Sequence, residues 1–173
     1  NRFLLHESAH PQVANAKDPK HRFLICDLEN GGALEPLSSE LYTWAPALSP
    51  DGVWCYYFID ETELNGGRLT LRKRRLGGSE AETLCVVDAP LAGMKHQPSR
   101  PYLLSTIRSD GKKLATAAFF GHGRRETVDY GLMVFDLEAG AVEVVLHGPT
   151  WCNLHPQYCR SRDAERMYDI MVQ

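Results

Sequence analysis

Long apolar runs, a helical apolar period and an excess of positive charge are all missing from this sequence of 173 residues. No apolar stretch approaches the roughly 20 residues that a membrane-spanning helix needs. Lys and Arg number 19 against 22 Asp and Glu, which gives a formal net charge of −3. We therefore expect neither nucleic acid nor a membrane as a partner. Because no segment keeps a 3.6-residue apolar period over several turns, the composition favours a fold built from strands.

The cysteines indicate neither a set of disulfide bonds nor a zinc site. There are five, an odd number, and Cys26, Cys55 and Cys85 lie in apolar, strand-like runs. Such positions predict reduced, buried thiols that act as small hydrophobic side chains. Cys152 and Cys159 are too far apart for a Cys-x-x-Cys pair and no second pair exists, which disfavours a four-cysteine zinc site.

What the sequence does contain is a recurring turn followed by an apolar strand. Ser49-Pro50-Asp51-Gly52 predicts a tight turn, because proline fixes φ and glycine supplies a positive φ, and Val53–Ile59 predicts a strand. The order returns at Ser109-Asp110-Gly111 before Lys112–Phe120, and in degraded form at Arg162-Asp163-Ala164 before Met167–Gln173. Recurrence at a nearly constant spacing indicates a repeat architecture with several strands in each unit.

The tails of the repeats also superimpose. FLICDLENGGALEPL, LTLRKRRLGGSEAETLCVV and LMVFDLEAGAVEVVL each read strand, glycine-containing turn, strand. We expect about twelve or thirteen antiparallel strands in four-stranded units, which is the pattern of an all-β fold, a β-propeller. The predicted parts are a blade tail (1–38), two blades (41–88 and 92–148) and the start of a fourth (151–173).

We further expect this chain to be a fragment of about three blades from a parent with seven. It begins at Asn1 and ends at Gln173 inside a strand-like run. A propeller closes only at four or more blades, so three would leave two apolar sheet faces open. The basic run Arg72–Arg75 is predicted to protect an outer edge strand.

Ligands of a propeller are expected in the central channel, near the innermost strand of each blade. Those strands are predicted near Thr43–Leu48, Pro98–Ile107 and Asn153–Cys159. In the last segment Asn153, His155 and Gln157 alternate and so share one face. They predict a divalent metal of the Mn²⁺ class or a sugar carboxylate, or else a structural polar ladder bonded to backbone and water.

Two further groups of polar residues precede strands. His96 and Arg100 belong to a cationic stretch at the start of a blade, which predicts either an anionic substrate or a solvated loop. His6, Glu7 and His10 are followed by Arg22, a grouping suited to acid–base chemistry. Residues 6–10 formally match the His-Glu-x-x-His zinc motif, but a strand-like run before them and Pro11 after them disfavour the helix that motif needs.

The repeat resembles that of the TolB-type, WD40-like propellers, and the chain is similar to oligogalacturonate lyase. The segment from Leu5-His6-Glu7 to Arg22 resembles the one that carries the family's Brønsted-base arginine, and His155-Pro156 resembles its metal-binding histidine before proline. The resemblance implies a seven-bladed lyase in which a divalent metal, Mn²⁺ or another, binds the uronate carboxylate and acidifies the C5 proton. Arg22 would abstract that proton. His155 would be the remaining metal contact. The alternation in the last segment adds Asn153 and Gln157 as expected metal ligands, and we expect His6, His10, His96 and Arg100 to bind substrate.

The sequence departs from the family at several of these positions. Family histidines six residues before each Asp-Gly correspond to Ala45 and Leu104, and two further metal ligands correspond to Thr150 and Asn153. Two hypotheses follow. One is a lyase that acts on uronate oligosaccharides by β-elimination. The other is a non-catalytic TolB-type propeller that binds a glycan or a protein in its channel.

Overall fold

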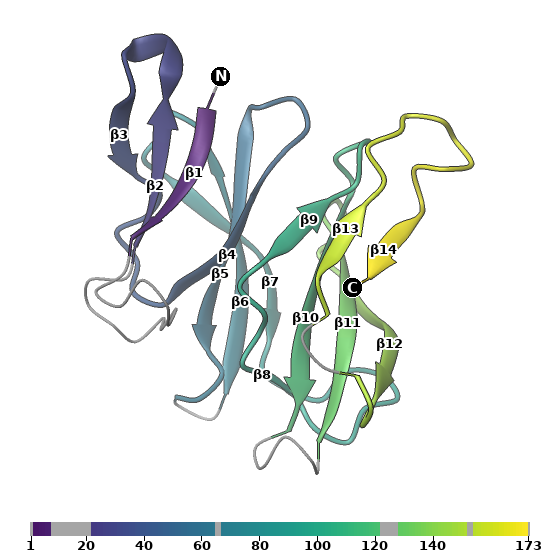
Figure 1. The fold of residues 1–173 in the computed structure, drawn as a ribbon. Coiled ribbons are helices and arrows are strands. Elements are labelled where there is room, and N and C mark those ends of the chain that lie inside the picture. Colours follow the sequence, from purple (N-terminus) through teal and green to yellow (C-terminus); the bar gives the residue numbers. More distant parts are fainter. Residues whose placement is uncertain (1, 8–21, 65–66, 122–127, 152–153, 173) are drawn as a thin grey trace.

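The computed structural model describes residues 2–7, 22–64, 67–121, 128–151 and 154–172, which form four antiparallel sheets set side by side in chain order (Figure 1). The sheet orders are β1-β2-β3, β4-β5-β6-β7, β12-β11-β10-β8 with β9 also paired to β10, and β13-β14. The only helical element in these ranges is one short 3₁₀ turn. No described helix is long and apolar enough to cross a membrane.

The strands follow the predicted positions closely. They are β1 (Arg2–Glu7), β2 (Arg22–Asp27), β3 (Ala33–Pro36), β4 (Thr43–Leu48), β5 (Trp54–Glu61), β6 (Arg68–Arg75), β7 (Ala81–Val87), β8 (Pro98–Ser99), β9 (Ser105–Ile107), β10 (Lys113–Phe120), β11 (Asp129–Asp136), β12 (Val142–Gly148), β13 (Pro156–Tyr158) and β14 (Ile170–Val172), with the 3₁₀ turn η1 at Leu28–Asn30.

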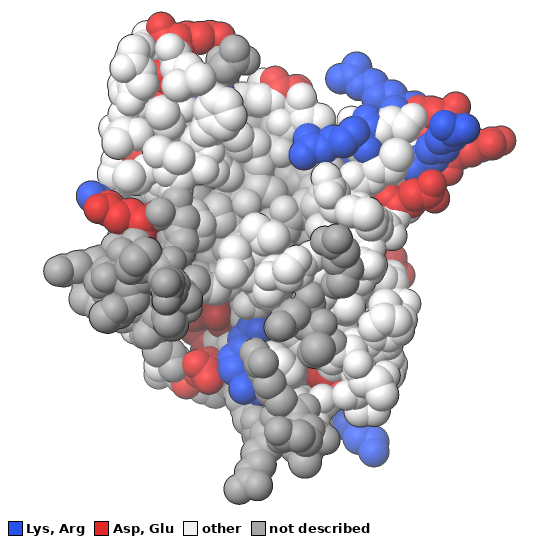
Figure 2. Space-filling view, viewed as in Figure 1, with Lys and Arg blue, Asp and Glu red and all other residues white. Residues whose placement is uncertain are grey.

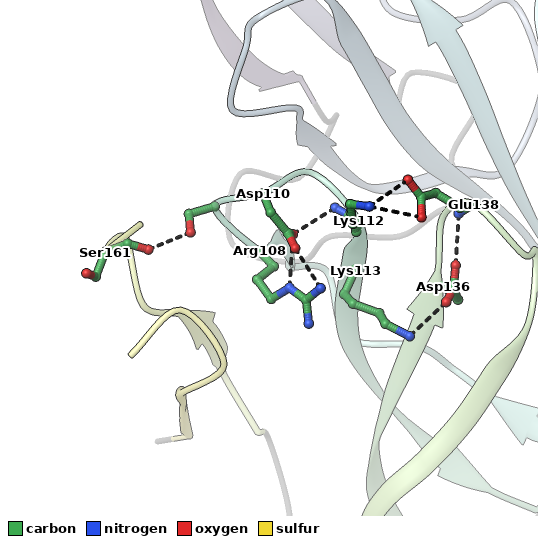
Figure 3. Close-up of polar contacts among 8 residues, drawn as sticks. Arg108, Asp110, Lys112, Lys113, Asp136, Glu138 and Ser161 are labelled. Carbon is green, nitrogen blue, oxygen red and sulfur yellow. Dashed lines mark hydrogen bonds and ion pairs between the residues drawn. The ribbon is translucent and has the colours of Figure 1, made fainter. Parts of the chain in front are cut away.

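The recurring Asp-Gly turns are held by their own side chains. Gly52 has φ 71°, and its N–H donates to the Ser49 carbonyl at 2.9 Å. The Asp51 carboxylate accepts the Ser49 hydroxyl and the Val53 N–H, and these bonds lower the pKa of Asp51 below its ordinary value. In the next repeat Asp110 accepts the Lys112 N–H in the same way (Figure 3). The turn is therefore a self-contained unit, which explains why it is readable from sequence.

Apolar side chains pack between successive sheets. Phe23 and Ile25 of the first sheet meet Cys55 and Tyr57 of the second, and Phe58 of the second meets Phe135 of the third with ring centroids 5.2 Å apart. The third and fourth sheets share a cluster that includes Ala115, Ala117, Phe119, Leu132, Leu154 and Tyr158. Face-to-face stacking of this kind is what blades of a propeller need, since one sheet cannot bury both faces.

Cys26, Cys55 and Cys85 are free thiols as predicted, but only Cys55 is buried, while Cys26 and Cys85 are partly exposed. Cys55 is completely buried. Its burial raises the pKa of the Cys55 thiol to about 12. Cys55 therefore stays a neutral packing residue at any physiological pH.

The first sheet has an apolar face with nothing packed on it among the described residues. Phe3 pairs with Cys26, and Cys26 pairs with Leu34, so the three side chains form a row across the sheet. Phe3 is 53% exposed and Leu34 57% exposed. Leu5, on the same side two residues along β1, is 42% exposed. Among the described residues, this side of β1-β2-β3 is therefore an exposed apolar surface.

The interpretation of Arg72–Arg75 as edge protection was wrong. The run lies in β6, which has β5 on one side and β7 on the other. Arg74 instead donates to the Gly78 carbonyl at 2.6 Å and to the carbonyls of Pro36 and Leu37 in the preceding sheet. Arg74 therefore bonds backbone carbonyls of the preceding sheet segment, a role that a charge pattern alone does not distinguish from edge protection.

Candidate functional site

Three inner strands, one from each of the last three sheets, lie next to one another and form the described part of the axial surface (Figure 1). Side chain-to-backbone bonds join them. The Ser105 hydroxyl of β9 donates to the Ala45 carbonyl of β4 at 2.6 Å, and the Tyr158 N–H of β13 donates to the Thr106 hydroxyl at 3.2 Å. Trp44 of β4 donates its indole N–H to the Pro101 carbonyl at 2.9 Å. Groups on the three strands are thereby fixed relative to one another.

Two of the inner strands are interrupted before the Asp-Gly turns. Ala45 has φ 44°, and the pairing of β4 with β5 shifts between Trp44 and Ala47. Arg100 has φ 47° and lies in the gap between β8 and β9. A positive φ at a residue other than glycine costs energy, and such distortions recur where a strand must re-aim side chains. The interruptions mark this part of the axial surface as the place to look for a site.

The most notable contact there joins Tyr102 to His155. The phenol oxygen lies 2.5 Å from Nε2 of the imidazole, and the two rings stack with centroids 4.7 Å apart and 24° between their planes. Which group donates depends on the imidazole tautomer. Tyr102 is also fixed by its own N–H, which donates to the Ala117 carbonyl at 2.6 Å. Both side chains are half-buried, so they present one fixed aromatic and polar surface.

Arg100 is held by contacts of both its side chain and its backbone. Its guanidinium carbon lies 4.5 Å from the centroid of the Phe119 ring, a cation–π contact. The backbone N–H of Arg100 donates at 2.9 Å to the hydroxyl of Thr62. Thr62 is buried, and its hydroxyl donates to the Asp60 carboxylate at 2.6 Å. The segment that leads to Tyr102 is therefore anchored at its start.

The other predicted substrate contact of this stretch, His96, is exposed. A side chain added at Gly121, at the end of β10, would place its Cβ 3.4 Å from Cδ2 of His96. The next residue, Gln97, donates to the Gly67 carbonyl at 3.0 Å. His96 thus lies beside the end of β10, outside the stacked pair.

Arg22, the predicted base, is on the first sheet. It opens β2 directly opposite Glu7 of β1, and its Nε forms an ion pair with the Glu7 carboxylate. Both side chains are about half exposed. His6 lies in β1 opposite Phe23, so the start of the formal zinc motif is a strand, as expected. His10 lies outside the described residues.

The predicted metal ligands are placed only in part. Asn153 lies outside the described residues, Gln157 of β13 is exposed, and His155 immediately precedes β13. Nε2 of His155 is already in contact with Tyr102. Within the described residues, no group of three or more His, Cys, Asp or Glu side chains could hold a metal ion. An imidazole and an amide do not complete a divalent site, so the described donors do not fit the metal by themselves.

Ala45 and Leu104, which the sequence resemblance matched to histidines, provide no side-chain metal donor. Ala45 is completely buried, and its backbone carbonyl is used by Ser105. Leu104 is 44% exposed, and its carbonyl accepts the Thr116 hydroxyl at 2.9 Å. Tyr102 was not singled out from the sequence. One signal could have identified it: Tyr102 is an aromatic residue shortly before the inner strand β9, as His155 is a polar residue just before the inner strand β13.

Comparison with known proteins bears on the fold. No family model matches the sequence, and no curated protein matches it either. Among solved structures, the chain is similar to an oligogalacturonate lyase in complex with manganese, with 21% identity over 80% of this chain and a TM-score of 0.56. An oligogalacturonate lyase from Vibrio parahaemolyticus gives 20% identity over 80% of this chain and a TM-score of 0.56. TolB from Acinetobacter baumannii gives 16% over 91% with the same TM-score.

These similarities establish the fold as part of a β-propeller, related in architecture to the lyase and TolB types. This chain covers 36% of each lyase and 33% of TolB, so it spans about a third of the length of these proteins. The all-β propeller predicted from the repeated turn is confirmed.

Proposed function

We propose that this part of the propeller binds an acidic oligosaccharide, a uronate chain, at the axial surface formed by Arg100, Tyr102 and His155. The observation that carries the proposal is the fixed contact between Tyr102 and His155 beside a guanidinium that is held over Phe119. Aromatic rings stack on the apolar face of a sugar, and arginine suits a carboxylate because its planar N–H groups match the two oxygens.

A second, catalytic candidate is β-elimination on the same class of substrate. It is favoured by the architectural similarity to oligogalacturonate lyase, one example of which was solved with manganese, and by the position of Arg22 at the start of β2. Arg22, in its neutral form, would take the C5 proton of the uronate. The C4–C5 double bond would form as the bond from C4 to its oxygen breaks, and the leaving oxygen would take a proton from water. A substrate carboxylate near Arg22 would have to compete with Glu7 for the guanidinium. A protein ligand on the axial surface is the remaining alternative.

Binding is tested by isothermal titration of the protein with trigalacturonate. His155→Ala and Arg100→Gln should each weaken binding by about tenfold or more, because each removes a polar contact to a charged or hydroxylated ligand. His147→Ala is the matched control, since His147 lies on β12 and pairs with Asp129 instead. Absence of binding by the unmodified protein, or an equal loss in the control, would overturn the proposal.

Catalysis is tested separately by following the ultraviolet absorbance of the unsaturated uronate product with and without added Mn²⁺. If the chain or the longer protein that contains it is a lyase, product forms and Arg22→Gln abolishes it while binding persists. If the protein binds the oligosaccharide but forms no product at any metal concentration, the lyase hypothesis is wrong and the non-catalytic propeller is supported.

A further inference from the structure

A hollow lies at the end of the inner strands that faces away from the interruptions at Ala45 and Arg100. It has a volume of about 630 Å³, within the usual range for small-molecule sites. Its lining comes from four successive sheets: the start of β1, the end of β4 and its Asp-Gly turn, β9, and the segment after β13. In Figure 1 the start of β1 and the segment after β13 both lie in the upper part of the view, on either side of the second sheet and β9.

The charge of this hollow is of one sign. Arg2, Arg160 and Arg162 line it, and none of the described lining residues is Asp or Glu. The whole chain carries a formal net charge of −3, so three arginines around one hollow are a local concentration. Figure 2 shows basic and acidic side chains side by side at the upper right of the molecule, next to an uncharged central surface, so the single sign of charge applies to the lining of the hollow and not to the surface around it.

Two of the three guanidiniums are not neutralised. Arg2 contacts Asp27 at 3.4 Å. Arg160 and Arg162 are exposed, and neither forms an ion pair with a residue in the described ranges. Arg162 also borders the neighbouring hollow that contains Asp110, but the Asp110 carboxylate is bound by Arg108 at 2.9 and 2.7 Å (Figure 3). The Asp110 carboxylate is thus already engaged by Arg108.

Hydroxyl groups of the lining add polar contacts between the arginines. Ser109 donates to the Ser161 carbonyl, which fixes the loop that carries Arg160 and Arg162 against the third sheet (Figure 3). The Thr106 hydroxyl accepts the Tyr158 N–H at 3.2 Å, and its own proton remains available to an oxygen ligand. Arginines and a donor hydroxyl that line one hollow are groups that bind carboxylate or phosphate oxygens.

We propose that this hollow, which Arg2, Arg160 and Arg162 surround, is a binding site for a small polyanion that bears carboxylate or phosphate groups. The site is separate from the surface at Tyr102 and His155, and it does not depend on the function proposed for that surface. A ligand here would contact all four sheets at once and would bind the described blades to one another.

The test is titration of the protein with pyrophosphate and, in a second series, with citrate, at low and high sodium chloride. Arg160→Gln and Arg162→Gln should each raise the dissociation constant by about tenfold or more, since each removes a charge-assisted bond. The series with the tighter binding identifies phosphate or carboxylate as the preferred group. Arg166→Gln is the matched control, because Arg166 is exposed on the same loop and does not line the hollow.

His155→Ala is the second control. It removes a contact of the oligosaccharide surface and should leave anion binding unchanged, so the two proposals fail independently. No binding of either anion, or equal weakening in Arg166→Gln, would show that the arginines form only a general basic surface and would overturn the proposal.

Discussion

The phenol oxygen of Tyr102 lies 2.5 Å from Nε2 of His155, and this contact joins the segment before the third inner strand to the segment before the fourth. It occupies Nε2, one of the two imidazole nitrogens through which His155 could bind a metal ion. A histidine in this state is a fixed, hydrogen-bonded surface group until Tyr102 is displaced.

Removal of the phenol hydroxyl should therefore expose His155. Tyr102→Phe keeps a ring to stack on the imidazole but leaves Nε2 without its partner, so we expect diethylpyrocarbonate to modify His155 several times faster than in the unmodified protein. Mass spectrometry of the peptide that contains His155 measures the rate. His147 in the same sample is the internal standard, since its contact with Asp129 is unchanged. An unaltered rate at His155 would contradict this account of the pair.

The indole of Trp44 should stabilise the junction between the second and third sheets. Trp44→Phe deletes the N–H that donates to the Pro101 carbonyl at 2.9 Å and leaves that buried carbonyl without this donor. The free energy of unfolding in urea should fall by about 1–3 kcal/mol. Trp151→Phe is the matched change at a residue that is 43% exposed, and it should have little effect. Equal losses in the two variants would rule out a specific role for the bond.

The carboxylate of Asp136 gives a prediction for pH. Bonds from the N–H groups of Ala139 and Glu138 and from Lys113 hold the pKa of Asp136 at about 2, below the ordinary 3.8. A lowered pKa in the folded state stabilises the fold above 3.8, and that stabilisation is lost as pH falls toward 2. Asp136→Asn should therefore lower the urea midpoint at neutral pH, and the difference should shrink over that range.

The control for this change is Asp88→Asn, at an exposed position after β7. Its urea midpoint should follow that of the unmodified protein at every pH. A difference at Asp136 that is constant with pH would mean that the charge of the carboxylate is not what stabilises the turn.

The open apolar face of the first sheet should make the chain self-associate. Phe3, Leu5 and Leu34 are all exposed on one side of β1-β2-β3, and contiguous apolar surface of this kind favours association. Sedimentation should show that Phe3→Lys with Leu34→Glu reduces association at a fixed protein concentration. Val145→Lys, on the exposed part of β12, is the control. Monomers in the unmodified protein would contradict the expectation.

The fold could be predicted because its signals are local. Each Asp-Gly turn bonds to its own neighbours, as Asp51 does with Ser49 and Val53, and each following strand is an apolar run. Two contacts of Arg74, in contrast, are made with residues distant in sequence. They are with the carbonyls of Pro36 and Leu37, so the charge run was misread as an edge.

The candidate site was harder to predict for the same reason. Ala45 and Arg100 have a positive φ, and because neither residue is a glycine, the sequence gives no sign of this backbone conformation. Tyr102 becomes a site residue only because His155, 53 positions later, is brought against its hydroxyl. Sequence patterns located the inner strands but could not show which side chains meet across them.

The bonds between inner strands have a practical consequence for a split protein. The connection from β7 to β8 is exposed at Ala89, Pro90, Gly93 and Lys95, whereas Trp44, Pro101, Phe58 and Phe135 join the sheets on either side of it. A single tryptic cut at Lys95 would yield two peptides that still elute as one species. The same position would therefore accept separate expression of the two pieces, with reassembly as the readout for ligands that hold the blades together.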